Sequence, residues 1–497
     1  MNNKINKINW SIPFCIYVLI NCFMLFFHEP WRDEMQAFSH AKTSNSITDL
    51  FYSTRYEGHP SLWFLMLFLY TRISTSIFIL QFLHLIIMFS GVYVLLRYST
   101  IKMLQKILIV FGYYFIFEYS LLFRNYSIGI TLLFITCVFI EKRKILFSAI
   151  LIFIVLQTNV YSFFLGISLW LICFIPFYKL SARNAIIGTL IIFIGIFFFV
   201  LNVLPPNDSG YAVGYQIKLW PILSTFINIW KSFILIPKFD IHFWNSNILE
   251  YLPEKNNILI MRIASVFLFL FILFILRKSN RAIIYFIVCI LLLTAFSGIK
   301  FDGYLRHNGH IFISFIIALW IKEIFPNKVL LFKDISFLKR CNEQFYIKRE
   351  SNYFLNILLL IHVFCGFVAY YYEYHYSFSK AKEVATYLKV NKMTDYQIIG
   401  HSDFSVSTIA SMLNRKVYYP TSKDSSTFIV WNNKRNENVS EEQLLQILSQ
   451  KRKENNQVLL ITSFKIQNIT LLNLNNVKLI KTFKPAIVES EEFYLYR

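Results

Sequence analysis

The stretch His28-Glu-Pro-Trp-Arg-Asp-Glu-Met35 follows one strongly apolar segment and places a dense group of ionisable side chains at its end. Before the next apolar segment the chain adds further ionisable side chains, among them Arg55, Glu57 and His59. Charged groups beside a bilayer are costly to desolvate, so this density requires a reason. Either residues 28–60 are a solvated loop, or the acidic pair Asp33-Glu34 is a base for a substrate presented from the lipid.

The composition is that of a membrane protein with several spans. The chain is 56% hydrophobic and 19% aromatic, and apolar runs recur at roughly 17 to 20 residues, the length that crosses the hydrocarbon core. The net charge is +21, but the basic residues cluster in short loops between the apolar runs. This is the positive-inside pattern of membrane proteins, and it argues against a nucleic-acid partner.

The basic clusters also predict the topology. Lys4 and Lys7 precede the first span, which places the loop 28–60 on the outer face. The apolar piece 61–73 is too short to cross about 30 Å, and a crossing there would put every later basic cluster outside. We therefore expect a re-entrant or juxtamembrane helix at 61–73 and about eleven spans elsewhere. The expected spans are 11–27, 77–96, 107–123, 126–140, 145–159, 161–178, 185–204, 258–276, 282–298, 310–325 and 353–372.

A change of composition near residue 376 divides the chain. We expect residues 1–375 to form an α-helical polytopic membrane domain and residues 376–497 a soluble extracytoplasmic α/β domain. Helices are predicted in the second part at 380–390, at 404–413 and from Ser440, where Ser-Glu-Glu-Gln is a capping-box pattern. Strands are predicted at 397–400, 416–420, 427–431, 457–463, 477–483 and 493–497.

The same topology brings further polar residues to the outer face. Glu118 and Arg124 lie at the outer end of an expected span, with Tyr126 close behind, and Arg306 and His307 lie between two later spans. A guanidinium donates two parallel hydrogen bonds and is well suited to a phosphate. The alternative for such an arginine is snorkelling to the lipid headgroups.

A divalent metal ion is one option for the histidines of this face. Glu57 and His59 could ligate a cation together with His307 or His310. Their spacing in the chain is loose, and plain hydrogen-bonded loop residues are the alternative.

Several of these motifs resemble the GT-C class of integral-membrane glycosyltransferases. Within that class the likeness is to the branch that holds protein O-mannosyltransferases, lipid A aminoarabinose transferases and many bacterial relatives. The motifs that carry the resemblance are Trp31-Arg-Asp-Glu-Met-Gln-Ala-Phe38, Tyr56-Glu-Gly-His-Pro60, Arg124-Asn-Tyr126, Leu305-Arg-His307 and the ending Phe493-Tyr-Leu-Tyr496.

The resemblance implies transfer of a sugar from a polyprenyl-phosphate carrier to a glycan, lipid or protein on the outer side of a bacterial cytoplasmic membrane. Asp33 matches the general base of the family, and Glu34 would orient the acceptor or the base. The residues implied to bind substrate are Arg32, Arg55, Glu57, His59, Glu118, Arg124, Tyr126, Arg306 and His307. Ile128-Gly129 stand where relatives often carry an acid, which argues against a metal-assisted mechanism.

Two other functions remain open. A polysaccharide polymerase or ligase that acts on lipid-linked oligosaccharide also needs an outward loop with arginines. A transporter or flippase needs ionisable residues and broken helices near the middle of the membrane, whereas the polar residues here gather at one rim.

Overall fold

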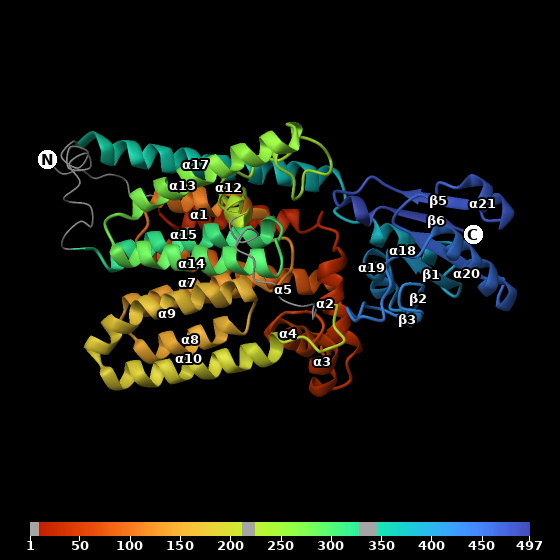
Figure 1. Cartoon of the computed structure of the whole chain (residues 1–497), viewed down its shortest axis with the longest axis horizontal. Helices are drawn as coiled ribbons and strands as arrows, with labels where there is room; N and C mark the ends of the chain where they lie inside the picture. Colours follow the sequence, from red (N-terminus) through yellow and green to blue (C-terminus); the bar gives the residue numbers. More distant parts are fainter. Residues whose placement is uncertain (1–8, 211–223, 328–344) are drawn as a thin grey trace.

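The chain folds into a long bundle of helices with a small sheet domain at one end (Figure 1). The computed structural model describes residues 9–210, 224–327 and 345–497, and of residues 345–351 only the backbone. Lys4 and Lys7, which were expected to mark the cytoplasmic side, lie outside the described residues.

Helices that run along the axis of the bundle form its wall and its core. They are α1 (Ser11–Met24), α5 (Ile77–Tyr98), α6 (Met103–Val110), α7 (Tyr126–Glu141), α8 (Ile145–Leu156), α9 (Val160–Leu180), α10 (Ala182–Val203), α13 (Glu254–Leu276), α14 (Asn280–Ile299), α15 (Leu305–Ile324) and α17 (Phe345–His375). Within the described residues, six are long and apolar enough to cross a membrane, namely α5, α9, α10, α13, α14 and the part of α17 from Asn352. The chain is therefore a mostly helical, membrane-associated protein, and these six do not make up the expected eleven spans.

The expected span 107–123 is not one continuous helix. α6 ends at Val110, and a π-helical turn, η1 (Tyr114–Glu118), follows. Backbone carbonyls that such a break releases need other donors inside a membrane protein. The hydroxyl of Tyr17 donates to the carbonyl of Phe115 at 2.7 Å, and that of Tyr370 donates to the carbonyl of Ile116 at 2.7 Å. Neighbouring helices thus stabilise the break.

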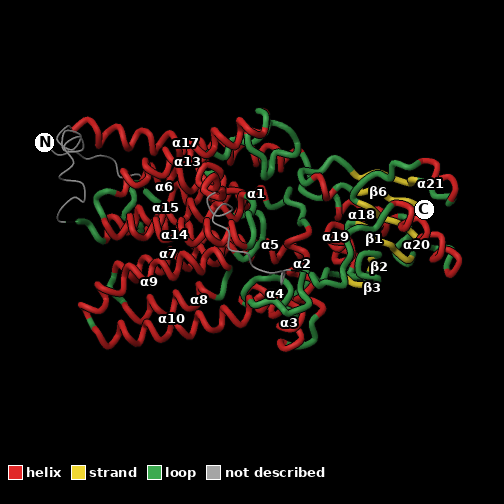
Figure 2. The backbone as a smooth tube through the Cα atoms, viewed as in Figure 1, coloured by secondary structure: helices red, strands yellow, loops and turns green. Residues whose placement is uncertain are grey.

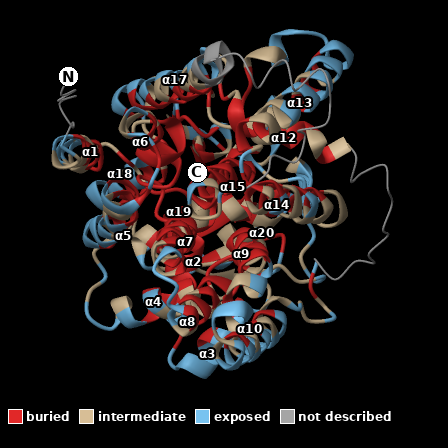
Figure 3. Ribbon diagram, turned by 90° about the vertical axis from the view of Figure 1, so that its left-hand side faces the viewer, coloured by how far each residue is buried: buried red, intermediate tan, exposed pale blue. Residues whose placement is uncertain are grey.

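Helix α15 is the centre of the bundle. Every residue from Leu305 to Ile321 is buried, and the end-on view shows the helix enclosed by the others (Figure 3). A helix that is apolar nearly all round must be buried on all sides. The polar residues of its first turns, which were expected in a loop, are consequently carried into the interior at the end of the bundle that lies next to the C-terminal domain, which is termed its outer end.

Three short helices cover this end. They are α2 (Arg32–Thr43), α3 (Ile47–Thr54) and α4 (Leu62–Thr71). α4 has ten residues, and at about 1.5 Å per residue it is too short to cross a bilayer, as the topology argument requires. A hydrogen bond between the side chains of Ser61 and Asn202 ties its start to the last turn of α10. Between α10 and α13 lie η2 (Thr225–Ile227), α12 (Asn228–Phe233) and η3 (Ile248–Tyr251).

The C-terminal domain is built on a six-stranded sheet with the order β3-β2-β1-β4-β6-β5. The strands are β1 (Gln397–His401), β2 (Val417–Tyr419), β3 (Asp424–Ser426), β4 (Val458–Thr462), β5 (Leu479–Phe483) and β6 (Phe493–Tyr496), and the helices are α18 (Ala381–Val390), α19 (Asp403–Leu413), α20 (Glu441–Glu454), α21 (Ile469–Leu474) and η4 (Glu489–Glu491). The strand expected at 427–431 is wrong. β3 lies earlier, and the backbone of Ile429 is bonded to the side chain of Gln36 instead of a neighbouring strand.

The domain turns one edge of its sheet towards α2. β1 and β4 are parallel, and β6 is antiparallel to β4. Because Glu491, just before β6, contacts Arg32 of α2, the carboxyl ends of β1 and β4 lie on the side of α2. Helix α2 is therefore placed between the bundle and the C-terminal domain (Figure 2).

Candidate functional site

Asp33 lies among three arginines at the outer end of the bundle. Its Oδ2 is 3.0 Å from Nη2 of Arg306 and 3.9 Å from Nη1 of Arg124, and its Oδ1 is 4.0 Å from Nε of Arg32. Arg124 also donates a hydrogen bond to the backbone carbonyl of Asp33. The expected convergence of the first loop with the two later arginines is thus present in the structure, and the Asp33 side chain stays 26% exposed.

The charges of this cluster do not balance. Burial alone would raise the pKa of Asp33, but Arg124, Arg306 and Arg32 outweigh it and hold the pKa below its usual value. Asp33 is therefore ionised, and one carboxylate faces three guanidinium groups. The cluster carries a formal excess of two positive charges.

Both deeper arginines have hydrogen-bonding capacity left over. The Nε–H groups of Arg124 and Arg306 are buried and have no acceptor within the described residues. The Arg306 guanidinium also lies over the rings of Trp31, Trp244 and Tyr304 at 5.3, 5.5 and 4.8 Å, which favours the cation. A buried donor without an acceptor is costly, so an additional anion that reached these two N–H groups would be bound favourably.

Tyr126 and His307 extend the site with a second donor. The backbone N–H of Tyr304 donates to Nδ1 of His307 at 2.9 Å, so a neutral imidazole carries its proton on Nε2. Nε2 lies 2.9 Å from the hydroxyl of Tyr126 and donates to it. This tautomer, assigned from the hydrogen-bond network, leaves the Tyr126 proton free to be donated into the site.

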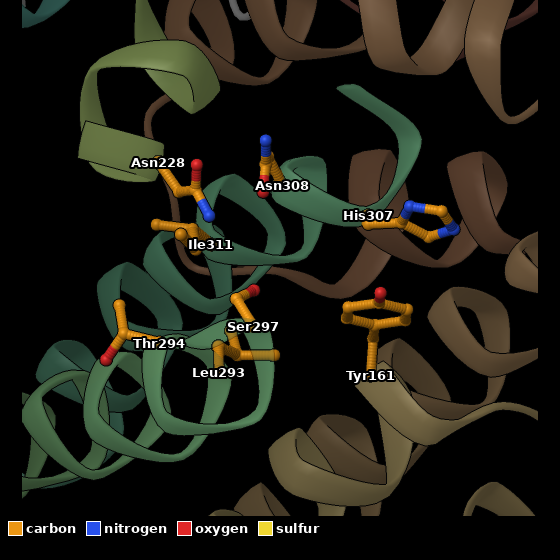
Figure 4. Close-up of a pocket in the computed structure, with 8 residues that line it drawn as sticks. All are labelled: Tyr161, Asn228, Leu293, Thr294, Ser297, His307, Asn308 and Ile311. Atoms are coloured by element: carbon orange, nitrogen blue, oxygen red, sulfur yellow. The ribbon is translucent and has the colours of Figure 1, made fainter. Parts of the chain in front are cut away.

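A shallow pocket lies behind His307. It is lined by Tyr161, Asn228, Leu293, Thr294, Ser297, His307, Asn308 and Ile311, and Figure 4 shows the Tyr161 ring below the His307 imidazole. The two rings stack at 4.9 Å. Most of the lining side chains are polar, so the polar surface of the Tyr126–His307 pair continues between the outer ends of α9, α14 and α15.

Glu34 does not reach the exposed part of the site. Its carboxylate is fully buried and accepts hydrogen bonds from the backbone N–H groups of Phe123 at 2.7 Å and Trp31 at 2.9 Å. Glu34 therefore cannot contact an acceptor substrate directly, and the expectation that it orients the acceptor is wrong. Glu34 instead joins the start of α2 to the segment that carries Arg124, and so holds Asp33 beside that arginine.

His28, which the sequence reading left without a role, lies behind Glu34. Its ring bridges Glu34 at 3.2 Å and Glu373 of α17 at 2.7 Å. Burial lowers the pKa of His28, but the charges and hydrogen bonds of Glu34 and Glu373 together outweigh burial and raise the pKa to about 10. A charged imidazole therefore links the first loop to the last helix of the bundle.

Glu57 and His59 line the other side of Asp33. The Glu57 carboxylate accepts from Nε2 of His40 at 3.0 Å and from the amide of Gln36 at 2.8 Å. His59 lies close enough to Asp33 for each to shift the pKa of the other. The sequence reading missed Gln36 and His40, although both lie on one face of the helix that starts at the acidic pair.

Three expected site residues are placed elsewhere or are already engaged. Arg55 is exposed, 5.8 Å from the Tyr52 ring. Glu118 is buried by the π-helical turn and accepts from Tyr113 and Trp244, so it does not lie at the outer rim. Arg32 donates to Ser490 of the C-terminal domain at 2.7 Å.

The expected metal ligands do not form a cluster. In the part of the chain that the structure describes, no three His, Cys, Asp or Glu side chains come together as a ligand set. Both ring nitrogens of His307 are hydrogen-bonded, and His310 lies among the rings of Tyr119, Tyr126 and Tyr161. Glu57 and His59 are thus not joined by the histidines of α15.

We expect Glu34→Ala to destabilise the protein by roughly 3–5 kcal/mol, because it leaves the Nε2–H of the charged His28 and two backbone N–H groups buried without an acceptor. Thermal unfolding of the purified protein in detergent would show the loss as a lower midpoint. Glu383→Ala is the matched control, since Glu383 is exposed and its pairs with Lys380 and Lys481 are each worth about 1 kcal/mol at most. Equal midpoints for the two variants would contradict the role of Glu34.

Replacement of His59 by Gln should remove part of the acid sensitivity of the fold. Burial, followed by the charge of Arg124, lowers the pKa of His59 from 6.5 to about 4. Between these values the unfolded chain binds more protons than the folded one, so stability is lost as the pH falls through this window. Unfolding midpoints at pH 7.5 and pH 5 should differ less in His59→Gln than in the wild type, and an unchanged difference would refute this.

Comparison with known proteins does not assign a family to this geometry. No family model matches the chain, and no curated protein matches it. We therefore infer the function from the contacts around Asp33.

Proposed function

We propose that the chain is an integral-membrane glycosyltransferase, which moves a sugar from a polyprenyl-phosphate carrier to a cell-envelope glycan, lipid or protein. The observation that carries the proposal is the meeting of Asp33 with Arg124 and Arg306 at the outer end of the bundle. These residues are the two components that such a reaction needs, a base for the acceptor hydroxyl and cations for the departing phosphate.

The charge of the cluster favours a departing phosphate over a bound one. A sugar linked through a phosphodiester carries one negative charge on the phosphate, and cleavage of the sugar–oxygen bond adds a second. As Asp33 takes up the acceptor proton, the negative charge that Asp33 loses appears on the phosphate, so the three guanidinium groups keep an anionic partner where the new charge develops. Interactions that strengthen as the bond breaks lower the barrier, whereas equal binding of both states does not.

The same arginines explain how a carboxylate with a lowered pKa can act as a base. In the free protein Arg124 and Arg306 hold the pKa of Asp33 down. When the donor phosphate attracts these guanidinium groups, their hold on Asp33 weakens and its proton affinity rises. The acceptor hydroxyl then gives its proton to Asp33, its oxygen bonds to the anomeric carbon, and the electron pair of the broken C–O bond goes to the phosphate.

We propose further that this end of the bundle faces outward from a bacterial cytoplasmic membrane, with the C-terminal domain outside. Each of the shorter helices α1, α7 and α8 would then cross together with the turns that flank it. With α15, the broken α6–η1 segment and the six long spans, this gives the eleven crossings. Donors that carry a single sugar or an oligosaccharide, assayed side by side, distinguish this function from that of a polymerase or ligase.

Asp33→Asn should lower sugar transfer by about 10² to 10⁴-fold, the range for loss of a general base, while insertion into the membrane is unchanged. The assay measures transfer of label from radiolabelled polyprenyl-phosphate sugars in membranes that contain the protein. Asp302→Asn, an exposed carboxylate on the same outer end, is the control and should behave as the wild type. Wild-type rates in Asp33→Asn would end the assignment of the base.

Arg124→Ala and Arg306→Ala should weaken use of the donor by about 10 to 100-fold, because each loses a charge-assisted hydrogen bond of about 1.5–3 kcal/mol. Donor and acceptor titrations measure kcat/KM for the donor and KM for the acceptor, and the acceptor KM should change little. Arg55→Ala removes an exposed arginine outside the cluster and should leave the donor kcat/KM unchanged. An unaltered donor kcat/KM in both cluster variants would contradict the phosphate role.

A further inference from the structure

The first turn of α2, which carries Asp33, is capped by a residue from the opposite end of the chain. The first N–H groups of a helix have no partner within it. The backbone N–H of Arg32 donates instead to Oε1 of Glu491 at 3.3 Å, across 459 positions of sequence. A carboxyl oxygen at this place satisfies a free donor of the helix.

Glu491 is held firmly in this position. It is fully buried at the end of η4, where its Oε2 accepts from the hydroxyl of Ser379 at 2.8 Å and its backbone carbonyl accepts from the N–H of Lys380 at 3.1 Å. The preceding residue, Ser490, accepts from the guanidinium of Arg32 at 2.7 Å. Two successive residues of the C-terminal domain, Ser490 and Glu491, thus accept hydrogen bonds from Arg32, the residue beside Asp33.

The remainder of α2 is attached to the C-terminal domain by independent contacts. The Gln36 amide donates to the carbonyl of Ile429 at 2.6 Å and accepts from its N–H at 3.0 Å. The hydroxyls of Ser39 and Ser411 bond at 2.7 Å. Loss of Glu491 should therefore loosen the first turn while the docking of the two parts persists.

We propose that Glu491 is a positioning residue for the base Asp33, which makes the C-terminal domain part of the catalytic centre. Acting as a helix cap supplied from a distant segment, it fixes the Arg32 backbone, and through it the direction in which the Asp33 carboxylate points. Its effect on catalysis rests on the function proposed above, whereas the cap itself does not.

The interaction needs a carbonyl-type oxygen and not a charge. Burial raises the pKa of Glu491 to about 8, even though Arg32 lowers it, so at neutral pH much of the group carries a proton. Oε1 accepts the Arg32 N–H in both forms. An amide in place of the acid should therefore preserve the cap, which gives the test a conservative variant.

The test compares full-length protein in detergent with Leu, Asp or Gln at position 491. Glu491→Leu removes the oxygen that accepts the Arg32 N–H. Glu491→Asp shortens the side chain by one methylene and so moves this oxygen away from the N–H, and Glu491→Gln retains it. Glu489→Leu, two positions away and exposed, is the matched control. Hydrogen–deuterium exchange of peptides that cover residues 28–38 measures the cap, and the transfer assay measures kcat and the donor KM.

We expect faster exchange in the first turn of α2 for Glu491→Leu and, less strongly, for Glu491→Asp, with no change in α14. kcat should fall by about a hundredfold in Glu491→Leu, as for an ångström-scale misplacement of a catalytic group, with the donor KM preserved. Glu491→Gln should restore both exchange and rate. If Glu491→Leu fails to fold, the Asp and Gln variants supply the same comparison.

Unchanged exchange in Glu491→Leu, or in Glu491→Asp if the first variant does not fold, would overturn the cap. Faster exchange with an unchanged kcat would overturn the positioning role. If the wild type transfers sugar from none of the donors, the proposed function fails, and the exchange data still decide whether Glu491 caps α2.

Discussion

The ion pair between Asp33 and Arg306 is the constraint on which the outer end of the molecule depends. It joins residues that are 273 positions apart, and it places a charged group at the start of a helix that is otherwise buried on all sides. A buried arginine is tolerated only when a carboxylate and further acceptors are close. The first turn of α15, the segment that carries Arg124 and the start of α2 must therefore meet at one point, and the helices behind them are packed to allow it.

Two further carboxylates fix the backbone beside Asp33, one within α2 itself and the other in the C-terminal domain. Glu34, with the charged His28 and Glu373, belongs to the bundle, whereas Glu491 belongs to the C-terminal domain. Each bonds backbone N–H groups around the turn and not the Asp33 side chain. This leaves the Asp33 carboxylate partly exposed while its backbone is fixed, which is the combination that a reactive side chain on a helix end requires.

The sequence predicts those features that follow from hydropathy and from the sign of the charge. Apolar runs and basic loops indicate the membrane helices, and the same parity brings Asp33, Arg124 and Arg306 to one face, where the structure has them. Hydropathy does not show where a helix breaks, so Glu118 was expected at the rim although the π-helical turn buries it. It also does not show which of two adjacent acids is buried. Nothing in the sequence distinguishes Asp33 from Glu34 in this respect. Glu34 is the buried one because it contacts Phe123 and His28. Glu491 gives no signal at all, because its role exists only through a contact with a helix near the other end of the chain.

The resting cluster also bears on how the proposed reaction could begin. Three guanidinium groups without a carboxylate would be a large uncompensated charge in a place that water reaches only in part, so Asp33 reduces that charge before substrate arrives. Arrival of a phosphate would then replace one anionic partner of Arg124 and Arg306 by another, and the buried charge would change little in the exchange. The carboxylate released from the pair would gain proton affinity at the moment when a leaving group is in place. A base that becomes stronger only when the sugar donor is bound would not deprotonate the acceptor hydroxyl in its absence. Binding of the donor before proton transfer would follow from the shared arginines, without any movement of the fold.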